Sequence, residues 1–470
     1  MKTHTCVLLS LTLATITVAC SDPNDVETDT SASSGTSGGN TSSTGTTTAG
    51  STGATGGTGR PGDCADPNDP NAPREGLSSD ITEDRTLSCE TIWVLEKIVF
   101  VRGATLSIDP GTTITGLSGS ALVIDVDATI DAQGTSDAPI VLTSNQPAGS
   151  RNRGDWGGLV LLGQATVNLA GGSGQAEGFA NPPTYGGNDP THNCGTLAYL
   201  RVEFAGFEIS PGSELNGITF YACGTDTTVH HVQSHMGADD GIEFFGGGFD
   251  LKYVVVTGAA DDSLDMDQGF SGTVQYAFLQ QDPALGDNAF EISNQGSDFT
   301  APPLTAPVIS NATVIGSGAS GDKSKGATFK EGTQAYLYNT ILMNATNEAF
   351  LLAHPETQAV AESGGLVLKN LLFFGNGSPQ FETSDGAGWD AAAFESFVLD
   401  AGNENLDGVD PALASTAWGA PDPTPSGDSP VAGAGTDPGQ PGLEATDYIG
   451  AIEPGAATLW FDGWTNFAPN

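Results

Sequence analysis

The chain has 470 residues, well above the roughly 150 residues of a typical domain, so it holds either several domains or one elongated solenoid. Its 14 Lys and Arg residues stand against 57 Asp and Glu residues, a formal net charge of −43. This charge argues against nucleic acid or an anionic membrane surface as partner, because both would be repelled, and it favours cations. The 38% of hydrophobic residues suffice for a core, and the 64 glycines indicate many turns and short strands.

Residues 1–19 have the pattern of a secretory signal peptide, with Lys2 ahead of a short apolar run that ends in small residues. These small residues precede Cys20 as in a bacterial lipobox, which predicts that Cys20 becomes the lipidated first residue of the mature protein. The alternative is ordinary cleavage near Ala19 that leaves Cys20 free. No other segment approaches the ~20 apolar residues of a membrane span, so we expect membrane attachment only through the lipid on Cys20.

A tether follows over residues 20–62. Residues 30–59 are almost entirely Ser, Thr and Gly without charge, a composition that stays a flexible coil with a mean reach of ~30 Å. Such a coil suits a link between a lipidated cysteine and a folded body. We therefore expect the protein in the cell envelope, anchored to the outer membrane or displayed at the cell surface.

Four cysteines remain beyond the tether: Cys64, Cys89, Cys194 and Cys223. An even number in an exported protein indicates two disulfides. Three pairings are possible, and proximity in the sequence favours Cys64–Cys89 and Cys194–Cys223. The first pair would staple an N-terminal segment over residues 63–90.

The body of the chain repeats a strand at intervals of 22 to 35 residues. The residue two places after the leading aliphatic of each repeat belongs to one set: Tyr199, His231, Tyr253, Tyr276, Asn311, Asn339 and Asn370. A second short strand with alternating apolar and polar residues follows in most repeats, as in 216–220, 240–244 and 288–292. Fixed local patterns at variable spacing are typical of stacked coils whose loops carry insertions.

These repeats predict an all-β fold, a parallel β-helix over residues 91–400 that forms a single solenoid with long loop insertions. Equivalent residues of neighbouring coils then lie about 4.8 Å apart. We expect the three asparagines of the set to form a ladder in which side-chain amides satisfy buried polar groups of the turns.

Further short segments carry a family resemblance: 100–108, 110–112, 130–135, 139–144, 155–158, 448–451 and 463–465. With the asparagine ladder, they resemble the right-handed β-helix of the pectin-lyase-like superfamily, and in particular exported bacterial β-helix lipoproteins without a settled function. The resemblance covers roughly residues 85–470. It implies the fold and carries little information on activity.

The C-terminal part, residues 401–470, is expected to be a loop over the last coils followed by a cap. Just before it, residues 389–399 favour a short helix capped by Asp390. We expect the final segment, with Trp460 and Trp464, to cover the open end of the solenoid. The alternative is an aromatic platform that binds sugar.

Acidic residues recur at equivalent positions next to the second strand. Outward carboxylates that sit about 5 Å apart raise one another's pKa unless a cation neutralises them, and calcium takes six to eight oxygen ligands. The predicted calcium ligands are Asp240, Glu243, Asp262, Asp265, Asp267 and Glu291. The alternative is that the aspartates cap the corners of the coils by accepting hydrogen bonds from backbone amides, with no metal. No other cofactor is expected.

A catalytic interpretation uses the paired aspartates Asp239, Asp240, Asp261 and Asp262. Their turns loosely resemble the paired-aspartate turn of β-helix polygalacturonases, in which two carboxylates ~6.5–9.5 Å apart act as acid and base. The Gly-His-Gly segment and the Arg-Ile-Lys strand of that family are absent here. Lyases of this fold use calcium together with a Lys or Arg that acts as the base. Lys252 and Arg201 are the candidates for this base, although both lie on the other strand of their coils.

Two smaller groups of side chains complete the candidates. Adjacent residues of a strand face opposite sides, so His230 and His231 are not expected to share one metal. We expect Lys323, Lys325 and Lys330 to neutralise the acidic column of the preceding coils; the alternative is that they mark the place where an acidic ligand binds.

The sequence thus favours a surface-tethered lipoprotein, monomeric, whose β-helix recognises an extracellular glycan or surface protein or has a structural or adhesive role, with calcium as a candidate ligand. The alternative function is a polysaccharide lyase or glycoside hydrolase that uses the carboxylates between Asp239 and Asp267.

Overall fold

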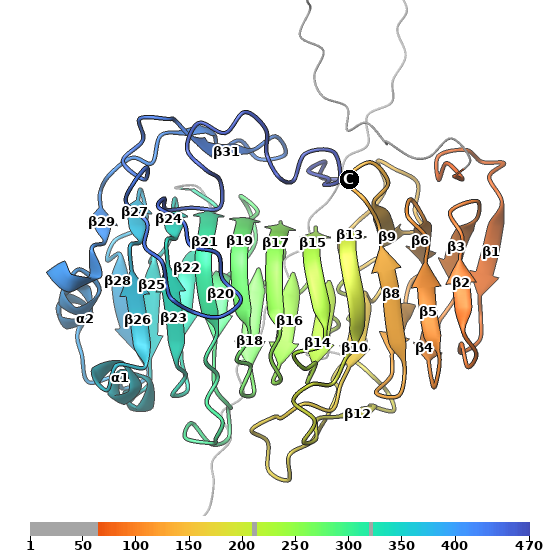
Figure 1. Ribbon diagram of the computed structural model, residues 1–470, viewed down its shortest axis with the longest axis horizontal. Helices are drawn as coiled ribbons and strands as arrows, with labels where there is room; N and C mark the ends of the chain where they lie inside the picture. Colours follow the sequence, from red (N-terminus) through yellow and green to blue (C-terminus); the bar gives the residue numbers. More distant parts are fainter. Residues whose placement is uncertain (1–63, 209–213, 319–322) are drawn as a thin grey trace, which may run out of the picture. The chain divides into compact units, whose positions relative to one another are not determined.

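The computed structural model describes residues 64–208, 214–318 and 323–470. The predicted signal peptide over 1–19, the lipidated Cys20 and the tether over 20–62 lie outside these residues. Within them the chain winds as a parallel β-helix, so the predicted all-β solenoid is confirmed (Figure 1).

Each complete coil contributes to three faces, which the strand pairings define. The first face contains β2 (Arg85–Leu87), β5 (Thr105–Ile108), β8 (Thr129–Gln133), β23 (Ala335–Tyr338) and β26 (Leu366–Lys369). The second face contains β1 (Arg74–Leu77), β3 (Ile92–Leu95), β6 (Thr113–Gly116), β9 (Ile140–Ser144), β24 (Ile341–Met343), β27 (Leu372–Phe374) and β29 (Leu406–Asp407).

Longer strands in the middle of the solenoid bend from the first face onto the second. They are β13 (Gly195–Glu203), β15 (Thr228–His235), β17 (Asp250–Thr257), β19 (Thr273–Gln280) and β21 (Val308–Ile315). The third face contains β4 (Ile98–Val101), β7 (Ala121–Ile124), β10 (Leu159–Leu162), β14 (Ile218–Tyr221), β16 (Ile242–Phe245), β18 (Leu264–Asp267), β20 (Asn288–Ile292), β22 (Lys325–Phe329), β25 (Phe350–Ala353) and β28 (Phe381–Ser384).

The predicted column of aromatic, histidine and asparagine residues marks the bend between the first two faces. All seven residues have a positive φ, between 48° and 60°, and the ladder pairing on either side skips them. The rings of Tyr199, His231 and Tyr253 stack with centroids 4.3 Å apart, and Tyr276 follows at 5.0 Å. A single left-handed residue therefore turns the strand at each coil, and its side chain lies against the equivalent one in the next coil.

The three asparagines of this column do not hydrogen-bond one another, contrary to the predicted amide ladder. Their side-chain amides instead donate to carbonyl oxygens of the C-terminal segment: from Asn311 to Tyr448 and Gly450, from Asn339 to Thr436, and from Asn370 to Ala434. The prediction failed because a covering segment offers main-chain carbonyls, which the sequence repeat does not reveal.

The interior of the solenoid is filled by inward-facing aliphatic and aromatic residues from all three faces. Phe220 and Phe244 stack at 5.6 Å inside the third face, with Phe270 at 4.6 Å from Phe244. Some outward-facing residues of the third face are also apolar. The insertion over 163–194, with β11 (Gly174–Gln175) and β12 (Thr184–Tyr185), covers them and packs Tyr185 against Tyr221 at 4.5 Å.

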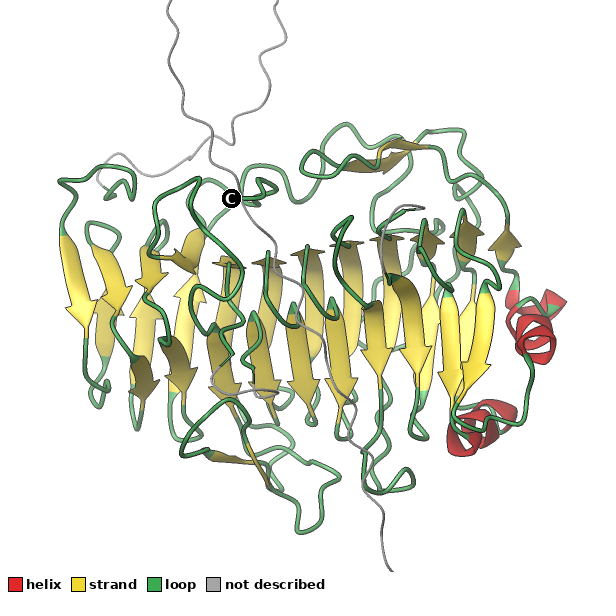
Figure 2. Ribbon diagram, turned by 180° about the vertical axis from the view of Figure 1, so that it is seen from behind, coloured by secondary structure: helices red, strands yellow, loops and turns green. Residues whose placement is uncertain are grey.

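The last coil is closed by helices, which Figure 2 shows at one end of the solenoid. These elements are α1 (Pro355–Glu362), α2 (Ala391–Val398) and the short 3-10 helix η1 (Ala401–Asn403). The predicted cap is confirmed, because the Asp390 side chain accepts a hydrogen bond from the backbone N–H of Ala393. Phe394 and Val398 of α2 are fully buried in the core.

The final segment, by contrast, does not cover the open end, and that prediction is wrong. After β30 (Leu413–Ser415) and β31 (Asp422–Pro425), the chain returns along the second face and the bend. Trp464 is fully buried beside Tyr199 and His231 in the middle coils. Since its ring is not exposed, Trp464 provides no sugar-binding platform.

Side-chain amides hold this C-terminal segment in place. Gln275 donates to the carbonyl of Glu444 and accepts from its N–H, both at 2.8 Å. Gln233 forms the same two-bond pair with Asn466, at 2.6 and 2.8 Å. Side chains of the β-helix thus bind the C-terminal segment mainly through the main-chain groups of that segment.

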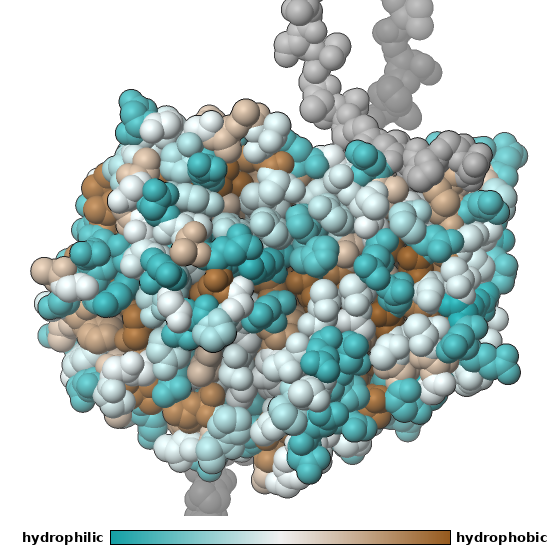
Figure 3. Space-filling model, viewed as in Figure 1, coloured by the Kyte–Doolittle hydropathy of each residue, from teal (hydrophilic) through white to brown (hydrophobic). Residues whose placement is uncertain are grey.

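Both predicted disulfides are present: Cys64–Cys89 and Cys194–Cys223. They indicate an exported protein, since such bonds persist in oxidising compartments. Among the described residues, no helix has the length and apolar character that crossing a membrane requires. On the face in Figure 3, hydrophobic residues form small patches among hydrophilic ones.

Candidate functional site

The acidic residues gather at the corner between the second and third faces. Each coil turns there before the third-face strand begins, and in the three coils of β16, β18 and β20 the first outward residue of that strand is also acidic. Strand pairing aligns Glu243 with Asp265 and Asp265 with Glu291 in three successive coils. The predicted carboxylate column is therefore confirmed, and it follows directly from the shared register of β16, β18 and β20.

A second column caps the corner. The Asp240 carboxylate accepts a hydrogen bond from the N–H of Asp262 at 2.9 Å, and the Asp262 carboxylate accepts one from the N–H of Asn288 at 2.6 Å. The side-chain oxygen of Asn216 likewise accepts a hydrogen bond from the N–H of Asp240, at 3.3 Å. Asp240 and Asp262 are both buried. They therefore act as corner caps, as the alternative interpretation of these residues predicted.

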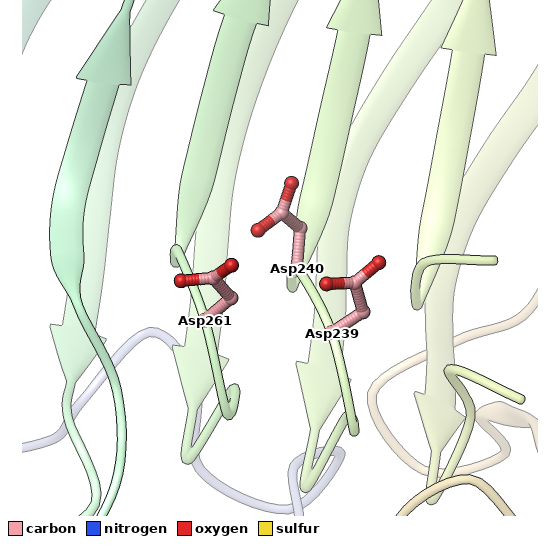
Figure 4. A group of neighbouring side chains, drawn as sticks. All are labelled: Asp239, Asp240 and Asp261. Atoms are coloured by element: carbon pink, nitrogen blue, oxygen red, sulfur yellow. The ribbon is translucent and has the colours of Figure 1, made fainter. Parts of the chain in front are cut away.

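The side-chain oxygens approach one another closely. In four groups of three residues, one oxygen of each member lies within 4.8 Å of the others. The groups are Asp239–Asp240–Asp261, Asp240–Glu243–Asp265, Asp261–Asp262–Asp287 and Asp262–Asp265–Glu291. Figure 4 shows the first of them, with two residues from one turn and the third from the equivalent turn of the next coil. We call the eight residues of these groups the carboxylate cluster.

Among the six predicted calcium ligands, Asp267 lies apart from these groups. It is the last residue of β18, two places beyond Asp265, and its carboxylate accepts a hydrogen bond from the N–H of Gln268 at 2.5 Å. Burial raises the pKa of Asp267 to about 7.

Two of the three predicted lysines neutralise one end of the carboxylate cluster, whereas the exposed Lys323 forms no ion pair with any described residue of the cluster. Lys325 pairs with Asp287 at 3.0 Å, and Lys330 pairs with Glu291. Within the described residues, no ion pair reaches the other six members of the cluster.

The sequence did not reveal that Glu177 and Glu214 also lie near the cluster. Glu177, in the insertion over 163–194, lies beside Glu243, and burial raises the pKa of Glu177 above its ordinary value. Glu214 adds negative charge beside Asp239. Neither residue belongs to the repeat, and a contact between residues 177 and 243 has no signature in local spacing.

Burial and crowding make ionisation of the cluster costly. Burial, with the charge of Asp261 next in importance, raises the pKa of Asp239 to about 7. Burial and the neighbouring carboxylates also raise the pKa of Asp240 and Glu243 well above their ordinary values. Burial and neighbouring carboxylates raise the pKa of Asp262 and Asp265 in the same way. Without a cation, the cluster therefore retains protons at neutral pH.

One oxygen in the middle of the cluster has no partner. Asp265 Oδ1 is buried and accepts no hydrogen bond from any described residue, although Asp265 belongs to two of the four groups. A buried carboxylate oxygen without a donor is costly. Two oxygens bound to one calcium ion at about 2.4 Å lie at most about 4.8 Å apart, so the spacing of the groups fits a shared cation.

The same spacing bears on the catalytic interpretation. Oxygens of Asp239, Asp240 and Asp261 lie closer together than the ~6.5–9.5 Å that separates the carboxyls of an inverting pair. Asp240 and Asp262 are buried and engaged as caps. The candidate bases are also engaged elsewhere: Lys252 pairs with Glu444 at 2.8 Å, and Arg201 with Glu203 at 2.9 Å.

The histidines differ from the prediction. His230 and His231 do not face opposite sides, because His231 has a positive φ of 54° and breaks the alternation of the strand. Their Nδ1 atoms lie 3.0 Å apart. His235 is fully buried away from the cluster: its Nδ1 lies 2.6 Å from Thr257 Oγ1, and its Nε2 donates to the carbonyl of Ala468 at 2.7 Å.

A groove lies on the second face near the N-terminal end of the solenoid. Its volume is about 670 Å³, and the loop after β9 and the segment before β1 form its sides. The lining residues are Pro67, Asn68, Pro70, Arg74, Val94, Thr115, Leu117, Ser144, Asn145, Gln146, Pro147, Ala148 and Arg151. Apolar patches between amide and guanidinium donors are typical of small-ligand sites. The sequence did not single out this groove.

Comparison with known proteins agrees with this architecture. Stacked parallel strands on three faces define a parallel β-helix. The chain belongs to the family of pectate-lyase-like β-helix domains, which it matches over residues 79–420. No curated protein and no solved structure matches the chain.

Proposed function

We propose that the protein is an exported binding protein of the cell envelope, in which the β-helix presents a saccharide-binding groove and calcium stabilises the coils at the carboxylate cluster. The groove is the observation that carries the binding function. The predicted lipid on Cys20 and the tether over 20–62 would hold this domain at the membrane surface.

Free hydrogen-bond donors support a saccharide in the groove. Asn145 accepts from Thr115 at 3.0 Å through its oxygen, while its amide nitrogen has no partner among the described residues. The Asn68 side chain also has no described partner. Leu117 is 37% exposed, and it offers apolar surface to the C–H face of a sugar ring. Hydroxyl groups of a sugar suit such mixed donors and apolar walls.

Calcium in the carboxylate cluster is supported by Asp265 Oδ1, a buried acceptor without a donor. The donor set consists of oxygen atoms alone, which hard cations prefer. A bound calcium ion would replace the protons that the cluster otherwise retains, and it would join successive coils at their corner. In this proposal its role is structural.

A catalytic role has less support. Oxygens of Asp239, Asp240 and Asp261 lie closer together than an inverting displacement requires, and Asp240 and Asp262 cap the corner. A cluster this acidic would also repel an anionic polysaccharide.

The saccharide proposal can be tested with a glycan array of cello-, xylo-, chito- and galacturono-oligosaccharides, probed with the calcium-loaded full chain. Hits are then titrated by calorimetry. Asn68→Ala and Asn145→Ala should each weaken binding several-fold, whereas Asn347→Ala, far along the chain, serves as the control. Failure of every oligosaccharide to bind refutes the proposal, and so does equal binding by the groove variants. Release of shortened products would instead establish the enzyme.

The calcium proposal has a separate test. At 100 times the dissociation constant, calcium adds about 2.7 kcal/mol to the free energy of unfolding, which a chelator removes. Thermal unfolding with and without EGTA measures this difference. Asp265→Asn should abolish most of it. An identical melting temperature in both conditions contradicts calcium binding.

A further inference from the structure

A pair of histidines outside the carboxylate cluster and outside the groove forms a chelating arrangement. Val229 and Val232 of β15 point into the core, and the two residues between them, His230 and His231, are both partly exposed. The positive φ of His231 at the bend places both imidazoles on the outside. Their Nδ1 atoms lie 3.0 Å apart, with ring planes nearly perpendicular at 87°.

The ring of His231 is held from both sides. Tyr199 and Tyr253, from the preceding and following coils, stack on it with centroids at 4.3 Å. Trp464 lies edge-on to the same ring at 5.9 Å. The orientation of the imidazole is therefore set by the fold, so little conformational freedom is lost when a ligand binds its nitrogen.

We propose that His230 and His231 bind one copper(II) ion through their two Nδ1 atoms. Metal–imidazole bonds of about 2.0–2.1 Å place two nitrogens about 2.9 Å apart at a right angle and about 3.3 Å apart at a tetrahedral angle. The observed 3.0 Å fits the right angle, which square-planar copper(II) or nickel(II) prefers, and copper(II) binds more strongly of the two. Water completes the coordination.

The protonation balance of this step is simple. In the metal-free protein, one imidazole donates its Nδ1–H to the Nδ1 lone pair of the other. Copper needs both lone pairs, so the donor ring moves its proton to Nε2 and no proton is released overall. In the neighbouring coil Lys252 is aligned with His230, and its charge is offset by Glu444, which pairs with it at 2.8 Å. The net charge of −43 draws cations towards the whole chain.

The neighbouring tryptophans report on the site. Centroids of Trp464 and Trp460 lie 5.9 and 6.5 Å from His231, so copper(II) bound there should quench their fluorescence, whereas zinc(II) should not. The experiment titrates copper(II) chloride into the full chain without a histidine tag, in excess calcium to occupy carboxylates. We expect saturable quenching with a micromolar dissociation constant, and a paramagnetic resonance spectrum with coupling to two nitrogens.

Variants separate this site from adventitious binding. His230→Gln removes one ligand, and His231→Phe removes the other while preserving the aromatic stack. Each should raise the dissociation constant at least tenfold, whereas His192→Gln should leave it unchanged. A spectrum with oxygen ligands only, or unchanged affinity in both variants with native circular dichroism, overturns the proposal and leaves the two histidines as a hydrogen-bonded pair. Glycan binding in the groove is independent of these outcomes.

Discussion

Asp239→Asn should make the calcium-free protein more stable at neutral and higher pH. The pKa of Asp239 is raised from 3.8 to about 7 by burial and by the charge of Asp261. A raised carboxyl pKa means that the folded state binds the proton more tightly, so stability falls as pH rises from about 4 to about 7. The raised pKa of Asp239 therefore lowers the free energy of unfolding by roughly 4 kcal/mol above about pH 7. This figure is an upper bound, because the side chain is partly exposed.

The substitution removes the ionisable group, and no described hydrogen bond to the Asp239 side chain is lost with it. With EGTA at pH 8, we expect a gain of up to about 4 kcal/mol, or roughly 5 °C in melting temperature for about 400 folded residues. At pH 4 the gain should vanish, since Asp239 is then protonated in both states. Calorimetry at the two pH values measures both quantities.

Calcium provides the complementary measurement. The ion should stabilise the wild-type protein more than Asp239→Asn, because the substitution removes one carboxylate ligand and part of the repulsion that calcium relieves. Asp137→Asn, at an exposed turn residue of the N-terminal coils, is the matched control. A gain that is equal at pH 4 and pH 8, or a destabilisation at pH 8, refutes the electrostatic reasoning.

Three further outcomes follow from packing and covalent contacts. Phe244→Ala should lower the free energy of unfolding by about 3–5 kcal/mol in denaturant titrations, because the ring is fully buried between two other phenylalanines. Replacing Cys194 and Cys223 by Ala should cost about 3–4 kcal/mol in the same assay, from the 29-residue separation of the bridged cysteines. Gln275→Ala should release residues around Glu444, seen as faster amide exchange there, whereas Gln133→Ala at the exposed end of β8 should not.

The sequence predicted the parts of the molecule that repeat. Tyr253 and Asn311 recur at one position of each coil because that position bends the strand, so the stacking of equivalent residues could be inferred before any coordinates. The alignment of Glu243 with Asp265 followed from the same register. The disulfide pairing was also accessible, since each pair lies within about 30 residues.

Features outside the repeat were not predictable. Glu177 reaches Glu243 from an insertion that has no equivalent in other coils. Trp464 was expected at the open end because a terminal aromatic segment commonly covers a core, but the preceding helix α2 already fills that place. The expectation that adjacent strand residues face opposite sides failed at His231, because its left-handed backbone interrupts the alternation and leaves its side chain on the same side as that of His230.

The returning C-terminal segment changes how the solenoid can come apart. A stack in which each coil touches only its neighbours unravels from its ends. Here Asn466 is bonded to Gln233, a partner 233 positions earlier in the chain, and Ala468 to His235. The coils at the C-terminal end of the solenoid therefore separate from the stack only when the hydrogen bonds of the returning segment to the central coils are also broken. Folding, in turn, ends only when the last few residues have found the middle of the stack, which makes that closure a late and slow event.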